Sequence, residues 1–197
     1  MAENSPVLLF DVMDTLVYDP FHHAIPSYFG LDLAGFLAEK HATAWVEFEL
    51  GELEPEAYAA KMFRDGRRVD WQHFAAHVRD AYRFIDGMQE LLVELSQAGV
   101  EMHALSNYPV LYRLIDEKLG LSRWVKFSFV SCETRVRKPD PEAYLGAARA
   151  LGRDPASCIF IDDREKNCHA AEAVGMPSIV FRDATSLRAE LGARGIV

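Results

Sequence analysis

Short apolar runs alternate with helical segments through the second half of the chain, and this alternation restricts the fold more than any other feature. Val7–Phe10 is the first apolar run, and four more follow after residue 87. Strands that alternate with helices form parallel βαβ units, because each helix returns the chain to the start of the next strand. The predicted fold class is therefore α/β, with a doubly wound, Rossmann-like parallel sheet. The further strands are predicted at 100–105, 127–131, 158–161 and 178–181, and the helices at 88–98, 110–119, 141–151, 165–174 and 186–194.

Residues 17–86 interrupt this alternation and contain no convincing strand. Their patterns predict helices at 33–41, 43–50, 55–64 and 71–82. We therefore expect a sheet domain of residues 1–16 and 87–197, with residues 17–86 inserted as a helical cap. The insertion holds 13 of the 22 aromatic residues, which either build its own core or line a pocket for a flat substrate. We expect His22 and His23 to begin a helix rather than to face a site.

Charge and hydropathy argue against several classes of function. The chain has 197 residues, a net charge of -9 and no long basic run, which argues against a nucleic-acid partner. Its apolar runs are too short for a membrane span, and the start "MAENSPVLLFD" lacks the basic region of a signal peptide. Cys132, Cys158 and Cys168 lack the spacing of a metal site, so we expect buried, reduced thiols and a cytoplasmic location.

Polar residues that suit phosphate or a metal follow four of the predicted strands. They are Asp11 after the first strand, Ser106 and Asn107 after the second, Lys138 after the third, and Asp162 and Asp163 after the fourth. Taken singly, such residues are usually helix caps, turn residues or solvated side chains. However, ligands of open parallel sheets bind beyond the carboxyl ends of the strands, where all six would meet. The pattern therefore predicts a ligand site at this edge.

The chemistry available to these residues is phosphoryl transfer. A carboxylate such as Asp11 attacks phosphorus and forms an aspartyl-phosphate. Nucleophile and phosphoryl group are both anionic, so the reaction needs a hard cation such as Mg²⁺, which Asp11 and Asp163 could hold. The Ser106 hydroxyl and the Lys138 ammonium would stabilise the phosphoryl oxygens. The expected partner is a small phosphorylated substrate.

The same segments resemble the motifs of the haloacid dehalogenase-like (HAD) hydrolase superfamily. "FDVMDTL" is similar to its first motif, "LSNY" to its second, "RKPDPEAY" to its third and "FIDDREKN" to its fourth. The inserted helices resemble the small helical cap of its subfamily I. Within the superfamily, "DVMDTLVYDPF" and "DGMQELL" are most similar to plant plastid flavin mononucleotide hydrolase-like phosphatases. The resemblance implies a phosphoric monoester hydrolase that uses Mg²⁺, with a nucleotide such as FMN as a candidate substrate.

Position by position, the resemblance also implies roles for these residues. The implied nucleophile is Asp11, and the implied metal ligands are Asp11, the backbone carbonyl of Met13, and Asp163, with Asp162 behind them or as an alternate ligand. The implied phosphate-binding residues are Ser106, Asn107 and Lys138, of which Ser106 and Lys138 act with Asp11 in catalysis.

Met13 is a departure from the superfamily pattern. Phosphatases of the superfamily have a second aspartate at this position, which protonates the leaving oxygen and then activates water, an effect of about 10²–10⁴-fold. We expect Asp14 not to replace it, because neighbouring side chains on an extended chain point to opposite sides. The sequence thus predicts an intact metal site without its general acid, and much faster hydrolysis of aryl than of alkyl phosphates.

Two alternatives remain open. A 2-haloacid dehalogenase needs no proton for its halide, but such enzymes use no metal, and the resemblance places a non-acidic pair where this chain has Asp162 and Asp163. Without a cation, these acids and Asp11 would repel one another. The other alternative is a catalytically impaired phosphate-binding or interaction protein. Met13 favours it, and the presence of the remaining site residues opposes it.

Overall fold

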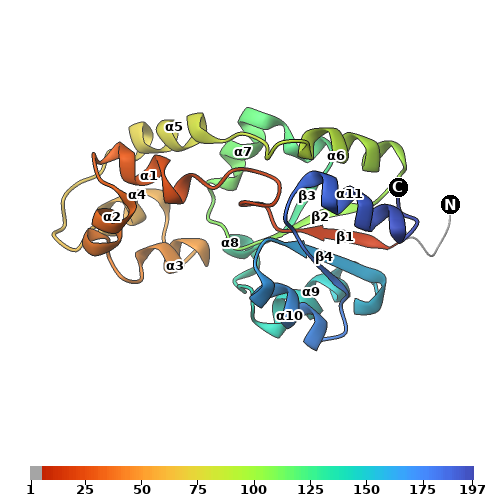
Figure 1. The fold of residues 1–197 in the computed structure, drawn as a ribbon. Helices are drawn as coiled ribbons and strands as arrows, with labels where there is room; N and C mark the ends of the chain where they lie inside the picture. Colours follow the sequence, from red (N-terminus) through yellow and green to blue (C-terminus); the bar gives the residue numbers. More distant parts are fainter. Residues whose placement is uncertain (1–5) are drawn as a thin grey trace.

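A parallel sheet forms the centre of the molecule. The computed structural model describes residues 6–197, so the first five residues of the predicted sheet domain lie outside it. Within these residues, five strands pair in parallel in the order β3-β2-β1-β4-β5 (Figure 1), which confirms the predicted fold class. They are β1 (Val7–Phe10), β2 (Met102–Ser106), β3 (Lys126–Val130), β4 (Cys158–Asp162) and β5 (Ser178–Val180).

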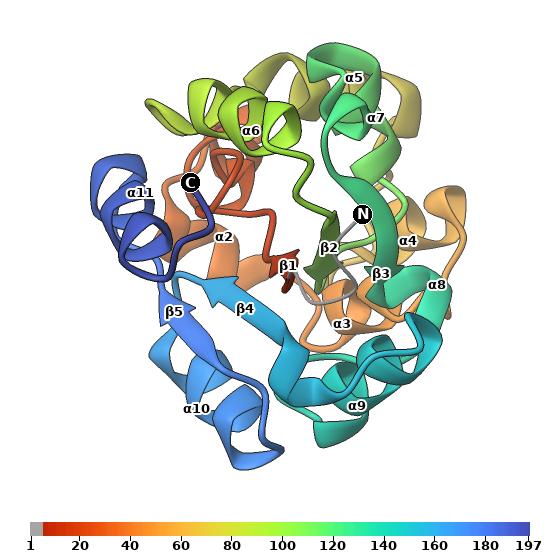
Figure 2. The ribbon, with the colours of Figure 1, turned by 90° about the vertical axis from the view of Figure 1, so that its right-hand side faces the viewer.

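Helices cover both faces of this sheet (Figure 2). On one side lie α6 (Met88–Gln97), α7 (Tyr112–Leu119) and α11 (Ala184–Ala193), and on the other α9 (Pro141–Ala150) and α10 (Glu165–Ala173). The alternation of side chains along β1 explains this arrangement. Leu8 and Phe10 belong to the hydrophobic cluster that contains the buried leucines of α6, whereas Val7 and Leu9 pack in the cluster with α9 and α10. A strand buried on both faces reads as a continuous apolar run, as it does here.

The register of the sheet places the end of β1 between its neighbours. Phe10 pairs with Ala104 of β2 on one side and with Ile161 of β4 on the other. The next residue, Asp11, donates its backbone N–H to the Ile161 carbonyl at 2.8 Å. The first acid of the predicted site therefore lies at the centre of the carboxyl edge, flanked by the residues that end β2 and β4.

The segment between β1 and α6 is helical, and we call its α-helices α1–α5 the cap helices. Figure 1 shows α1–α4 grouped to the left of the sheet. They are α1 (Ala24–Tyr28), α2 (Leu33–Glu39), α3 (Ala44–Glu49), α4 (Pro55–Lys61) and α5 (Trp71–Ala81), preceded by the 3₁₀ turn η1 (Pro20–His22). Many aromatic side chains of this segment pack edge to face, as do Phe29 and Phe63 with ring centroids 4.7 Å apart. The division of the chain into two domains stays a prediction.

Two short α-helices were not predicted, and the expectation for the histidines was partly right. The sequence did not indicate α1 or α8 (Ser131–Thr134), which has four residues. His22 ends η1, and His23 immediately precedes α1. The remaining elements are two further 3₁₀ turns, η2 (Leu121–Arg123) and η3 (Pro155–Ser157).

The structure agrees with the expectation for the cysteines. Cys132, Cys158 and Cys168 are free and buried, as expected for small apolar core residues. Across the described range 6–197, no helix combines the length and the apolar character needed to cross a bilayer.

Candidate active site

Lys138 lies between two carboxylates at the carboxyl edge of the sheet. Its Nζ is 2.8 Å from Asp11 Oδ1 and 2.7 Å from Asp162 Oδ2. All three side chains are buried. Burial opposes the charged ammonium, but the two carboxylates outweigh it and raise the pKa of Lys138. For Asp11, burial raises the pKa although the Lys138 charge acts in the opposite direction. The structure thus brings the predicted nucleophile and the predicted lysine into direct contact.

Asp162 and Asn107 fix the position of Lys138. Asp162 accepts hydrogen bonds from Asn167 Nδ2 at 3.0 and 3.1 Å and from the Arg164 backbone at 2.8 Å. Its oxygens are therefore engaged in orienting Lys138, which favours a position behind the metal over direct ligation. Asn107 holds the backbone of Lys138 from the other side: its Oδ1 accepts from Lys138 N and its Nδ2 donates to Lys138 O, both at 2.8 Å. The phosphate-binding role of Asn107 stays a prediction.

Asp163 has the features of a metal ligand. Its Oδ1 is buried and has no hydrogen-bond partner in the part of the chain that the structure describes. Carboxylate oxygens of Asp11, Asp162 and Asp163 lie within 4.8 Å of one another. Burial, together with the charges of Asp11 and Asp162, raises the pKa of Asp163 to about 6. Three acids against one lysine leave an excess of negative charge, so the donor set fits a hard cation such as Mg²⁺.

Ser106 is placed near this cluster, but below the surface. It ends β2, is 3 % exposed, and its Oγ has no hydrogen-bond partner among residues 6–197. A buried hydroxyl without a partner costs free energy, so such a group usually has a ligand or a water molecule to bind. This supports the predicted contact with a phosphoryl group without testing it.

A cavity of about 320 Å³ opens above the cluster, at the lower end of the range for small-molecule sites. Of the predicted residues, Asp11, Met13, Asn107 and Lys138 line it, whereas Ser106, Asp162 and Asp163 do not. Its wall also includes residues that the sequence argument did not assign to the site. These are Asp19, His22, Glu49, Tyr108, Arg137, Arg164 and Asn167, together with the aromatic residues Phe21 and Trp45.

A charged pair joins the cap helices to the sheet at this cavity. Glu49, the last residue of α3, lies 2.5 Å from Arg137 Nη2, which belongs to the loop before Lys138. Burial raises the pKa of Glu49, although the Arg137 charge opposes the shift. Neither residue has a motif that marks it. Their pairing depends on how α3 packs against the sheet, so no signal in the sequence could have identified it.

Asp14 does not replace the missing acid, as expected, but the expected reason was wrong. Asp14 does not lie on an extended chain: its φ is 55°, in the left-handed region. The backbone turns here, and Asp14 N donates to Val17 O at 2.7 Å. The Asp14 carboxylate accepts from the backbone N–H of Asp19 at 2.9 Å and does not line the cavity. Asp14 therefore holds the loop and is not a substitute for the missing acid.

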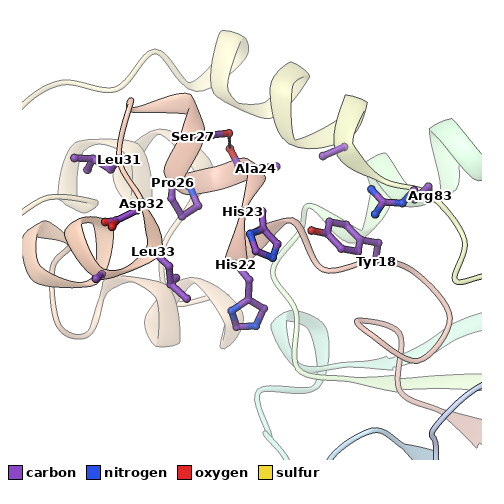
Figure 3. Close-up of a pocket in the computed structure, with 12 residues that line it drawn as sticks. Tyr18, His22, His23, Ala24, Pro26, Ser27, Leu31, Asp32, Leu33 and Arg83 are labelled. Carbon is purple, nitrogen blue, oxygen red and sulfur yellow. Dashed lines mark hydrogen bonds between the residues drawn. The ribbon is translucent and has the colours of Figure 1, made fainter.

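A second cavity, of about 700 Å³, lies beside the first. Figure 3 shows His22 and His23 projecting from the same turn, with His23 toward Tyr18. The rings of Tyr18 and His23 are stacked, with their centroids 6.2 Å apart. Arg83 Cζ lies over the Tyr18 ring, 3.8 Å from its centroid. His22 lines both cavities. One of the two histidines thus faces the site, an alternative that the sequence argument had considered but not favoured.

Most of the chain is similar to known hydrolases. Residues 6–175 match the model of a hydrolase family described as haloacid dehalogenase-like hydrolase. The sequence is 44 % identical over 191 residues to flavin mononucleotide hydrolase 1, a chloroplast protein of Arabidopsis thaliana, covering 97 % of this chain and 78 % of the relative. It is 27 % identical over 162 residues to the sesquiterpene phosphatase astK of Aspergillus oryzae, covering 77 % and 79 %.

The fold has solved counterparts. A HAD family enzyme from Bacteroides thetaiotaomicron, BT-2542, was solved in complex with magnesium and inorganic phosphate. It aligns with a TM-score of 0.73 and 20 % identity, covering 91 % of this chain and 95 % of that enzyme. At this level of identity, the likeness concerns the arrangement of the sheet and helices.

Proposed function

Because this chain belongs to the haloacid dehalogenase-like hydrolases, we propose that it is a Mg²⁺-dependent phosphatase that hydrolyses a small phosphate monoester through an aspartyl-phosphate on Asp11. The observation that carries this proposal is the contact of Lys138 with both Asp11 and Asp162, at 2.8 and 2.7 Å, beside the unpartnered oxygen of Asp163. One ammonium and three carboxylates at a strand edge suit a site for a cation and a phosphoryl group.

In this proposal each residue has a separate task. Asp11 attacks phosphorus, and Lys138 lowers the repulsion between its carboxylate and the phosphoryl oxygens. Ser106 donates its hydroxyl proton to one of those oxygens. Asp11 and Asp163 hold Mg²⁺ together with the Met13 carbonyl, and Asp162 supports Lys138. When bound, Mg²⁺ supplies positive charge that stabilises the transferring group.

The substrate class is proposed from the Arabidopsis relative described above. That relative is named as a flavin mononucleotide hydrolase and shares 44 % identity over nearly all of this chain. FMN is a primary alkyl phosphate with a flat ring, and Phe21 and Trp45 on the cavity wall offer aromatic faces. We therefore propose FMN as the first substrate to test. A cytoplasmic location also stays a proposal, since that relative is a chloroplast protein.

A panel of phosphate esters tests the proposal. Phosphate release is measured for FMN, other alkyl phosphates and 4-nitrophenyl phosphate, with Mg²⁺ and with EDTA. We expect turnover with Mg²⁺, none in EDTA, and recovery when Mg²⁺ is restored. Full activity in EDTA would contradict the requirement for Mg²⁺ and would make the dehalogenase alternative open again.

A second candidate function is favoured by Met13. Without a general acid, the same residues would bind a phosphorylated ligand and hydrolyse it slowly or not at all. Calorimetric binding of FMN with no phosphate release over hours would support this candidate. Rapid release from an alkyl phosphate would exclude it, because an alkoxide leaves slowly without a proton.

A further inference from the structure

The carboxyl group of Asp19 lies in the same cavity as the predicted nucleophile. Asp19 is 8 % exposed, and it lines the cavity together with Asp11 and Met13. Its Oδ1 accepts a hydrogen bond from Phe21 N at 2.9 Å, and its own N–H donates to Asp14 Oδ1 at 2.9 Å. These two bonds fix both the backbone and the side chain. Asp19 was not identified from the sequence, because an acid before Pro20 reads as a helix cap.

The surroundings of Asp19 shift its ionisation toward the protonated form. Burial raises its pKa to about 6, the hydrogen bond from Phe21 opposes this, and the charges of Asp14 and Asp11 add to it. The His22 imidazole, with Nε2 3.9 Å from Asp19 Oδ2, acts in the opposite direction. A carboxyl with these properties can both give and take a proton near neutral pH.

We propose that Asp19 is the general acid and base of this enzyme, in place of the aspartate that Met13 replaces. The proposal rests on the proposed phosphatase function. It follows from location: within residues 6–197, Asp19 is a buried carboxyl on the wall of the Asp11 cavity that has no arginine or lysine bound to it.

The proton balance of the reaction closes with this residue. As Asp11 attacks, an oxygen–phosphorus bond forms to its carboxylate and the bond to the leaving oxygen breaks. The electron pair stays on the leaving oxygen, which takes the Asp19 proton and departs as an alcohol. Asp19, now ionised, accepts a proton from water as the water oxygen attacks phosphorus and the bond to Asp11 breaks. This step releases inorganic phosphate and returns Asp19 to its acid form.

Other acids near the site are less suitable. The Asp14 carboxylate binds Asp19 N and does not line the cavity. Glu49 lines it but forms an ion pair with Arg137. The His22 side chain is 42 % exposed, and its nearest acid is Asp19 itself, so it is better placed to adjust the ionisation of Asp19 than to replace it.

The inference reverses one expectation from the sequence. If Met13 left the leaving group without a proton donor, wild-type enzyme would hydrolyse aryl phosphates far faster than alkyl phosphates. With Asp19 as the acid, wild type hydrolyses both, and the difference appears only when Asp19 is changed.

The experiment compares wild type, Asp19→Asn and Asp70→Asn. Asp70 is a matched control: it also caps a helix, accepting from His73 N at 3.0 Å, and it does not line the cavity. Asparagine caps a helix about as well as aspartate, so both variants keep their local structure. kcat and KM are measured for 4-nitrophenyl phosphate and for the best alkyl phosphate of the panel. Asp19→Ser, also a good cap without a carboxyl, serves if Asp19→Asn does not fold.

We expect Asp19→Asn to lower kcat for the alkyl ester by about 10²–10⁴-fold and for the aryl ester by much less, with KM little changed and Asp70→Asn like wild type. Met13→Asp, added to Asp19→Asn, should restore part of the alkyl activity. Equal losses on both esters would assign Asp19 a structural role and overturn the inference. So would a wild type that hydrolyses only the aryl ester, although the phosphatase function would then stand. Hydrolysis of neither ester would refute the proposed function and the inference with it.

Discussion

Lys138 is held between two buried carboxylates, so its charge matters for stability as well as for catalysis. Both contacts are shorter than 3 Å, and the lysine is 4 % exposed. Removing one member of a buried ionic group leaves the others without compensation, at a cost of about 3–5 kcal/mol.

We therefore predict that Lys138→Met, which keeps the length of the side chain, lowers the free energy of unfolding by about 3–5 kcal/mol and abolishes turnover. Urea denaturation in EDTA measures the first effect. Lys166→Met, at an exposed position of α10, is the control and should change stability by no more than about 0.5 kcal/mol. Stability equal to wild type would show that the site is not organised around this lysine.

The raised pKa of Asp19 should make the free energy of unfolding of the metal-free protein depend on pH. Its folded-state pKa of about 6 lies above the value of about 3.9 for an unfolded chain. As the pH falls from 8 toward 4, the folded protein therefore binds this proton first, and the free energy of unfolding rises. The contribution of Asp19 to this rise is on the order of 3 kcal/mol or less.

We expect Asp19→Asn to be more stable than wild type at pH 8 in EDTA and to show a flatter pH dependence. Urea denaturation from pH 8 to 5 measures both. Asp70→Asn should keep the wild-type slope. If Asp19→Asn kept that slope as well, the Asp19 carboxyl would be ionised in the folded state at an ordinary pKa.

At the residue level, the sequence predicted which residues end the strands, and the structure brings Asp11, Lys138, Asp162 and Asp163 together there. Asp19 could not be found in this way. Its proposed role depends on its burial at the wall of the cavity, and an Asp-Pro pair in the sequence carries no information about burial.

Among the elements, the end of α3 is joined by hydrogen bonds to the first residue of α8 and to the residue that follows this helix. Ser131 Oγ donates to Glu49 O at 2.6 Å, and Arg135 Nη1 donates to Leu50 O at 2.8 Å. Gly51 follows with a φ of 66°, and a Cβ at this position would overlap the backbone oxygen of Cys132. This junction sets the position of Glu49, and therefore of its partner Arg137 on the cavity wall.

Gly51→Ala should separate the two elements. We expect a loss of about 1 kcal/mol from the positive φ and a further loss from the overlap, together with a higher KM because the Glu49–Arg137 pair is displaced. Gly30→Ala is the control: Gly30 has a φ of 69° but nothing within 4 Å of a Cβ, so it should show the first loss alone. Thermal unfolding and KM for the alkyl ester are the measurements. Equal effects in both variants would mean that the junction does not constrain the cavity.

Prediction succeeded for the strands of the sheet and for the longer helices, and it failed for the two shortest α-helices. The strands of the sheet were predicted to within two residues at each end, because buried parallel strands are apolar throughout. By contrast, α8 has four residues and α1 has five, too few for a helical period to be recognised. Both helices depend on tertiary packing for their stability.

At the scale of the whole molecule, the cavity has walls from the strand ends and from the segment between β1 and β2, so binding should affect the stability of the entire fold. The excess of carboxylates at the edge of the sheet opposes folding until a cation is present. A ligand that binds only the folded protein stabilises it by about 2.7 kcal/mol at 100 times its dissociation constant.

We predict that Mg²⁺ at 100 times its dissociation constant raises the midpoint of thermal unfolding by about 5–10 °C. Asp163→Asn, which keeps the size of the side chain, should abolish this rise. Differential scanning calorimetry with and without Mg²⁺ measures it. The control is Asp183→Asn, a change at the exposed cap of α11, which should keep the full shift. A shift that survived Asp163→Asn would place the cation elsewhere.

The central claim is Mg²⁺-dependent phosphoryl transfer to Asp11, and phosphate release from 4-nitrophenyl phosphate by wild type and Asp11→Asn tests it most directly. An aryl ester needs little help from a general acid, so the result does not depend on Asp19. We predict turnover by wild type with Mg²⁺, none in EDTA, and none by a folded Asp11→Asn under either condition. Activity of wild type in EDTA, or of Asp11→Asn with Mg²⁺, would contradict the claim.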